Sequence, residues 1–158
     1  MGTTLFLIRH AHRDKSDPDA NNGISKKGQD QCFQLVDFLK RTGRAVQITE
    51  LISSPKLRCL ETAFPVGKLI RQSPLVDPRI DEQGKDEKDA TFEKRLWDFW
   101  SEKSRQSGLA LVSHGDVLPR LAGFEHLQVD KILKGQLLVL ENGKIRYLNP
   151  LKVLESKA

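Results

Sequence analysis

Short apolar runs that end in polar residues recur along the chain and predict buried strands. Residues 5–8, Leu-Phe-Leu-Ile, are continuously apolar, as in a strand buried on both faces of a sheet. Residues 109–112 have the same character, and the brief apolar pair at 51–52 predicts a third strand. Because each run is too short for a typical helix, we expect all three to lie inside a sheet.

Apolar residues at helical spacing predict amphipathic helices between these strands. Ser25 is a typical N-cap, and a helical pattern follows it until Gly43. Residues 91–107 show the same spacing and end at Gly108. A short helix is expected from Asp116.

A further helix start is predicted directly after the strand at 51–52. Ser54 is expected to be the N-cap and Pro55 the first helical residue, because proline is favoured there. Pro65 should kink this helix or end it early. The following residues, 74–91, are irregular and acidic, which indicates a solvated loop. The apolar face of the helix would carry Leu57, Leu60 and Phe64.

Strands that alternate with helices predict an α/β fold. We expect a three-layer sandwich, with a mostly parallel central sheet and helices on both faces. Asn142-Gly143 separates two apolar runs and predicts a tight turn, so residues 137–148 should form an antiparallel C-terminal hairpin. Residues 1–158 are interpreted as a single domain, with a polar stretch at 152–158 that is expected to fray.

Composition and charge narrow the class of protein. No apolar run approaches the roughly 20 residues of a membrane span, and the first residues lack a signal-peptide layout, so a cytoplasmic location without a membrane partner is expected. The net charge is +5, but the basic residues are scattered and aromatics are few, which argues against a nucleic-acid partner. Cys32 and Cys59 form no CxxC pair and are expected to be buried, reduced thiols.

The three predicted strands all lead into reactive residues. Arg9 and His10 follow the first strand, His114 follows the strand at 109–112, and Arg58 lies in the helical turn after residues 51–52. Ligands of open parallel sheets bind beyond the carboxyl ends of the strands. If these strands are parallel, two arginines and two histidines meet at one edge of the sheet.

Such a cationic cluster suits a phosphoryl group. The arginine fork matches phosphate oxygens, and nearby helix N-termini also favour an anion. Phosphoryl transfer further needs a nucleophile and a proton for the leaving oxygen. His10 is the candidate nucleophile, because it follows the strand directly and flanking cations should lower the pKa of its imidazole.

Four sequence elements resemble the histidine phosphatase superfamily, also called the phosphoglycerate mutase-like family. The family's Arg-His-Gly corresponds to Arg-His-Ala at residues 9–11, and its Leu-Thr-x-x-Gly-x-x-Gln to residues 24–31. Its Ser-Ser-Pro-x-x-Arg-x-x-x-Thr-Ala is intact at 53–63, and its Ser-His-Gly at 113–115. The resemblance implies that His10 carries the phosphoryl group as a phosphohistidine. The residues that it assigns to phosphate binding and transition-state stabilisation are Arg9, Arg58 and His114.

The resemblance also implies a catalytic acid. Residues 77–82 are similar to the family's Asp-Pro-x-Leu-x-Glu, which places the acid at Glu82. The pKa of Glu82 would have to be raised for it to protonate the leaving group. Alternative acids in the sequence are Asp81, Glu87 and Asp116.

Two positions depart from the family pattern. Ala11 replaces the usual glycine and cannot freely adopt a positive φ, although a small residue should still fit. The residues that follow, 12–14, are His-Arg-Asp rather than the family's Glu or Gln followed by Thr, which affects substrate contacts more than the core chemistry. We expect His12 at the rim of the site and His126 on the surface.

Two other classes of function fit part of the pattern. A metal-dependent hydrolase could use His10 and His12, whose spacing allows both to bind one ion, with Asp14, His114 or Asp116 as further ligands. The flanking arginines disfavour a divalent cation, so no metal or other cofactor is expected. A non-catalytic module that binds phosphorylated ligands is the second alternative.

The substrate class follows from the chain length. The segment 59–113 is nearly used up by one helix and an acidic loop, so we expect no large lid insertion and an open groove. In length the chain resembles the small bacterial phosphohistidine phosphatases, which act on protein-borne phosphohistidine. The expected partner is therefore a phosphorylated small molecule or a phosphoprotein, and a mutase is disfavoured. No pattern in the sequence indicates an oligomeric state.

Overall fold

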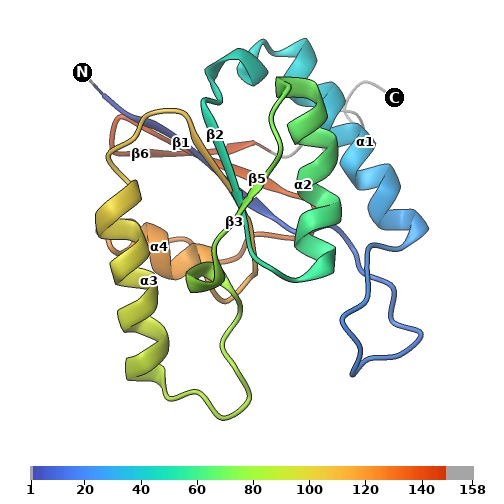
Figure 1. The fold of residues 1–158 in the computed structure, drawn as a ribbon. Coiled ribbons are helices and arrows are strands. Elements are labelled where there is room, and N and C mark those ends of the chain that lie inside the picture. Colours follow the sequence, from blue (N-terminus) through green and yellow to red (C-terminus); the bar gives the residue numbers. More distant parts are fainter. Residues whose placement is uncertain (1, 149–158) are drawn as a thin grey trace.

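A six-stranded sheet forms the centre of the computed structural model, which describes residues 2–148 (Figure 1). The strand order is β3-β2-β4-β1-β5-β6. The first four strands are parallel, β5 is antiparallel to β1, and β6 is antiparallel to β5. The predicted mostly parallel sheet with an antiparallel C-terminal hairpin is confirmed. The polar stretch at 152–158 lies outside the described residues. The strands are β1 (Thr4–Arg9), β2 (Glu50–Ser53), β3 (Leu75–Val76), β4 (Leu109–Ser113), β5 (Leu137–Glu141) and β6 (Lys144–Leu148).

Helices cover both faces of this sheet (Figure 1). One face packs against α1 (Lys26–Arg41) and α2 (Leu57–Ile70), and the other against α3 (Asp89–Lys103) and α4 (Leu118–Gly123). The predicted three-layer sandwich is therefore confirmed. Within residues 2–148, no helix is both long and apolar enough to cross a membrane. Two short 3₁₀ turns are η1 (Arg44–Gln47) and η2 (Pro78–Ile80).

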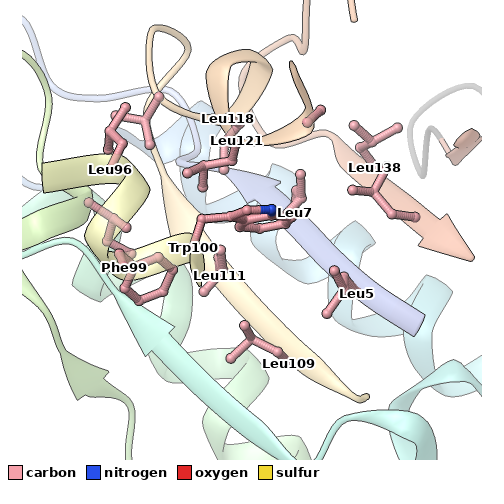
Figure 2. Packing of buried hydrophobic residues seen from close by; sticks show 14 of the residues in the cluster. Leu5, Leu7, Leu96, Phe99, Trp100, Leu109, Leu111, Leu118, Leu121 and Leu138 are labelled. Carbon is pink, nitrogen blue, oxygen red and sulfur yellow. The ribbon is translucent and has the colours of Figure 1, made fainter. Parts of the chain in front are cut away.

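The central strand β1 explains why its sequence is continuously apolar. Leu5 and Leu7 point into the core beneath α3 and α4, whereas Phe6 and Ile8 point into the core beneath α1 and α2. Figure 2 shows the first of these cores, where the Trp100 ring from α3 lies near Leu7 and Leu111. Burial on both faces removes the alternation seen in half-exposed strands.

Helix α2 differs from the prediction at its start and on its buried face. It begins at Leu57 with Lys56 as the N-cap residue, and the Ser54 hydroxyl lies 2.8 Å from His114 Nε2. It also continues through Pro65 to Ile70. Leu57 and Phe64 are exposed, and the helix packs on the sheet through small residues instead. Those residues are Cys59, Ala63 and Val66.

The segment expected to be an irregular loop contains more order than its sequence indicates. Residues 75–76 pair with β2 as an edge strand, and the 3₁₀ turn η2 follows after Asp77. Helix α3 begins at Asp89 and ends at Lys103, a few residues earlier than predicted at both ends. The predicted turn at 142–143 is confirmed, with positive φ at both residues.

Candidate active site

The carboxyl ends of β1, β2 and β4 lie at one edge of the sheet. Arg9 pairs with Ser113, and Ser53 pairs with Val112, so the residues that follow each strand emerge side by side. The His10 amide donates to the carbonyl of Ser113 at 3.0 Å. The His10 and His114 rings are consequently 5.4 Å apart, in an edge-to-face arrangement. The structure thus brings together the residues that the strand ends predicted to meet.

His10 is buried and has one ring nitrogen free of a hydrogen. Its Nδ1 lies 2.8 Å from the Ala11 carbonyl, which can only accept, so Nδ1 carries the hydrogen and Nε2 keeps its lone pair. Arg58 donates from Nε toward this Nε2 at 3.4 Å. Burial, and then the neighbouring His114, Arg58 and Arg9, lower the pKa of His10 to about 3, despite the bond to Ala11. The imidazole is therefore neutral at physiological pH.

Arg58 connects the remaining polar groups of the site. It lies in the first turn of α2, and its side chain is only 6% exposed. Its Nη2 donates to Glu82 Oε2 at 2.8 Å and lies 3.4 Å from His114 Nδ1. A buried guanidinium with several partners holds its position, so Arg58 presents a fixed positive charge beside His10.

The Arg9 side chain makes a hydrogen bond to the backbone, and its buried Nε has no partner among the described residues. Its Nη1 donates to the Ile132 carbonyl at 2.8 Å, while its Nε is buried without a hydrogen-bond partner among the described residues. A Cβ atom at Gly115 would lie 2.8 Å from the Arg9 guanidinium carbon, so a larger residue there would have to displace the Arg9 side chain. Burial lowers the pKa of Arg9, and Asp116 opposes that shift while Arg58 adds to it.

His114 is oriented from the side that faces away from His10. Its Nε2 lies 2.8 Å from Ser54 Oγ and 3.4 Å from Asp81 Oδ1. Burial opposes ionisation of Asp81, but hydrogen bonds from His114 and the Glu82 amide, together with Lys56, lower the pKa of this carboxyl to about 2. An ionised Asp81 and Ser54 thus fix the His114 ring.

The loop after His10 is held by two residues of the family motifs. Thr62 Oγ1 accepts from the Ala11 amide at 2.9 Å, and Gln31 Oε1 accepts from the His12 amide at 2.8 Å. A side chain at Gly28 would collide with the His12 carbonyl, which explains the glycine there. Ala11 is not among the described non-glycine residues with positive φ, so it replaces the family's glycine without backbone strain.

Glu82 and Asp116 line the cavity at His10, whereas Asp81 and Glu87 do not. A cavity of about 380 Å³ is lined by His10, Glu82, His114 and Asp116, among others. Glu82 is 40% exposed at this cavity. Asp116 also lines it, and accepts from the Gln83 amide at 3.1 Å. Asp81 lies behind His114, as described above, and Glu87 is paired with Arg95.

Arg95 was not singled out by the sequence, yet it organises the acidic loop. From α3 it donates to the carbonyls of Arg79, Asp81 and Glu82 at 2.7–2.9 Å. Its remaining donors form a bidentate pair with the Glu87 carboxylate. No periodic pattern could have revealed this role, because it depends on the path of the loop across α3.

Both cysteines are free and buried, as predicted. The Cys59 Sγ lies 3.6 Å from His114 Nε2, so it borders the site. Burial raises the pKa of Cys59 to about 12 and that of Cys32 to about 11. Both remain neutral thiols at physiological pH and are poor nucleophiles.

The two histidines with metal-ligand spacing, His10 and His12, both contact other protein groups. His12 Nδ1 lies 2.7 Å from Ser25 Oγ, and His10 Nδ1 contacts the Ala11 carbonyl. Within residues 2–148, no three His, Cys, Asp or Glu side chains are grouped in a way that could hold a metal ion. His126 is exposed, as expected.

Comparisons with known proteins agree with the fold and the motifs. The sequence model of the histidine phosphatase superfamily (branch 1) matches residues 5–94, and no curated protein matches the chain. A putative alpha-ribazole-5'-P phosphatase from Escherichia coli is 18% identical with a TM-score of 0.77, covering 93% of this chain and 96% of that chain. Identities this low show a shared fold only.

Two further solved structures have the same architecture. A mycobacterial glucosyl-3-phosphoglycerate phosphatase is 14% identical with a TM-score of 0.70, covering 94% of this chain and 99% of that chain. The protein histidine phosphatase SixA, complexed with tungstate, is 18% identical with a TM-score of 0.67, covering 96% of this chain and 99% of that chain. Enzymes with different phosphorylated substrates therefore share this fold.

Proposed function

This chain belongs to the histidine phosphatase superfamily, and we propose that it hydrolyses phosphate esters or protein phosphohistidine through a phosphohistidine intermediate on His10. Membership in the superfamily and the phosphatase neighbours support phosphatase activity. The observation that carries the mechanism is the neutral His10 ring, whose lone pair on Nε2 faces Arg58 in a cationic pocket.

The first step transfers the phosphoryl group to the protein. His10 Nε2 attacks phosphorus, a P–N bond forms, and the bond to the leaving group breaks. Arg9, Arg58 and His114 neutralise the charge on the phosphoryl oxygens. Glu82 donates a proton to the leaving oxygen or nitrogen, so the leaving group departs neutral.

The second step restores the free protein. A water molecule attacks the phosphoryl group and gives its proton to the Glu82 carboxylate. The P–N bond breaks, and its electron pair returns to His10 Nε2. Inorganic phosphate is released, and no cofactor is required by this balance.

The substrate is proposed to enter an open groove. The chain between Arg58 and His114 forms α2, β3, η2, α3 and β4, which supports our proposal of a single domain over residues 1–158 without a large lid. Such a groove admits either a phosphorylated small molecule or a phosphorylated loop of another protein.

The decisive experiment compares the wild type with His10→Ala, in the presence of EDTA. The substrates are p-nitrophenyl phosphate and a protein that carries phosphohistidine. We expect EDTA-resistant hydrolysis that disappears in His10→Ala, and an acid-labile phosphate on His10 in the wild type. His126→Asn is the matched control, because His126 is exposed and asparagine tolerates its positive φ.

Each alternative function has a distinct outcome in this experiment. Hydrolysis that is abolished by EDTA would support a metal-dependent hydrolase that uses His10 and His12. Binding of phosphate by a folded protein that hydrolyses neither substrate would support the non-catalytic module.

A further inference from the structure

A second cavity adjoins the candidate active site. It measures about 620 Å³ and shares Arg9 and Lys131 with the cavity at His10. Its other basic side chains are His12, Lys27 and Lys134. Among residues 2–148, no acidic side chain lines it. The two cavities are therefore neighbouring compartments that differ in charge, since Glu82 and Asp116 line only the first.

The lysines of this second cavity have no acidic partner among the described residues. In the part of the chain that the structure describes, Lys27, Lys131 and Lys134 form none of the ion pairs. Burial, then Lys15, Arg9 and Arg13, lower the pKa of Lys134. Burial, then Lys134, Lys15 and Lys27, lower the pKa of His12. The cations repel one another, and an anion among them would relieve this repulsion.

Arg9 connects the two compartments. It lines both cavities, and its Nε is buried without a partner among the described residues. A buried donor without a partner is rare in proteins. An anionic ligand that reaches from His10 toward Lys134 would pass this guanidinium.

We propose that the second cavity binds a second anionic group of the substrate, a phosphate or a carboxylate. The substrate class is then a small phosphoester with two anionic groups. This inference rests on the proposed function for the placement of the first phosphate. The concave shape and the limited volume favour a small molecule over the acidic surface of a protein.

Binding of ligands that cannot be hydrolysed tests this inference without requiring catalysis. Linear alkyl monophosphonates and alkane bisphosphonates of matched chain length are titrated into the wild type by calorimetry at low salt. We expect the best bisphosphonate to bind about tenfold more tightly than its monophosphonate, because the second group gains charge-assisted hydrogen bonds. Failure of the phosphatase assay with this preference intact would reject only the proposed chemistry.

Two double variants separate local binding from net charge. Lys27→Gln with Lys134→Gln should bring the ratio of bisphosphonate to monophosphonate affinity close to one. Lys40→Gln with Lys68→Gln removes the same charge in a different cavity, between α1 and α2, and should preserve the ratio. Equal affinities for both ligands at every chain length, or equal losses in both double variants, would overturn the proposal. Tighter binding of an acidic phosphonate-bearing peptide would overturn it in favour of a protein substrate.

Discussion

At the scale of single residues, burial and charge act in the same direction on the proton of His10. The residue is 5% exposed, and its ring lies beside two arginines and a second histidine. Each of these features disfavours the imidazolium. The single hydrogen bond that favours it, from Nδ1 to the Ala11 carbonyl, also fixes the tautomer that leaves Nε2 available.

The lowered pKa of His10 predicts a loss of stability in mild acid. Above pH 6.5 the ring is neutral in both the folded and the unfolded chain. Between about 6.5 and about 3, the unfolded chain binds a proton that the folded protein does not. The free energy of unfolding should therefore fall as pH falls, by up to about 1.4 kcal/mol per pH unit.

Urea unfolding of the wild type and His10→Gln measures this effect. The wild type should lose about 1 kcal/mol more than the variant between pH about 7 and about 5.5. His126→Asn should keep the pH dependence of the wild type. Parallel pH profiles for the wild type and His10→Gln would contradict the low pKa.

The proposed acid can be identified through the leaving group. Glu82→Gln should lower kcat/KM for an alkyl phosphate by about 10²–10⁴-fold, because its leaving oxygen needs a proton. The loss should be much smaller for p-nitrophenyl phosphate, whose phenolate leaves without one. Asp116→Asn is assayed in parallel, and a leaving-group dependence found only in that variant would assign the acid to Asp116.

The cluster around His10 could be predicted because strand order and motif positions determine it. Parallel strands bring their carboxyl ends together, so Arg9 and His114 had to meet once β1 and β4 were neighbours. The bond between Ser54 and His114 could not be predicted, since a serine before proline is equally suited to a helix cap. The second basic cavity was also missed, because its lysines come from segments far apart in the sequence.

At the scale of elements, α3 acts on the site through the acidic loop. Arg95 uses all its donors on that loop, including the carbonyls of Asp81 and Glu82. The loop has little regular structure of its own, so these bonds determine where the two carboxylates lie. The helix thus positions one side of the pocket without contributing a side chain to it.

Replacement of Arg95 should disorder this side of the pocket. We expect Arg95→Met to lower stability by about 2 kcal/mol, because several partly buried carbonyls lose their donor. It should also lower kcat more than it raises KM, with faster hydrogen exchange in residues 79–87. Arg95→Lys keeps the positive charge but loses the planar guanidinium with its five donors, so it should recover little of the stability or of kcat. Unchanged exchange in that loop would reject the positioning role.

The buried face of helix α2 could not be predicted from the spacing of its apolar residues. Its existence was predicted correctly, but the expected apolar face was wrong. Leu57 and Phe64 are exposed, because the close approach of α2 to the sheet selects small residues such as Ala63. Packing distance is a tertiary property that hydrophobicity along the chain does not encode.

At the scale of the whole molecule, the net charge of +5 and the basic side chains of the second cavity both attract anionic substrates. Positive potential around a concave site raises the rate of encounter with anions. Because this attraction acts through solvent, dissolved salt should screen it.

The positive charge therefore predicts that catalytic efficiency depends on the salt concentration. For a phosphorylated substrate, kcat/KM should fall severalfold between about 20 mM and about 200 mM sodium chloride, mainly through KM. Thermal unfolding at the same salt concentrations controls for changes in stability. A kcat/KM that stays constant would show that the rate at which substrate reaches the site does not depend on the basic side chains of the second cavity.

The position of β1 in the sheet has a consequence for how the protein forms during synthesis. The strand that leads to His10 is synthesised well before its two neighbours in the sheet, β4 (Leu109–Ser113) and β5 (Leu137–Glu141). Contacts between segments so distant in sequence close large loops and form slowly. Until then, the nascent chain carries an apolar strand with both edges unpaired, which is prone to aggregation. The proposed nucleophile is thus translated long before the strands that complete its native surroundings.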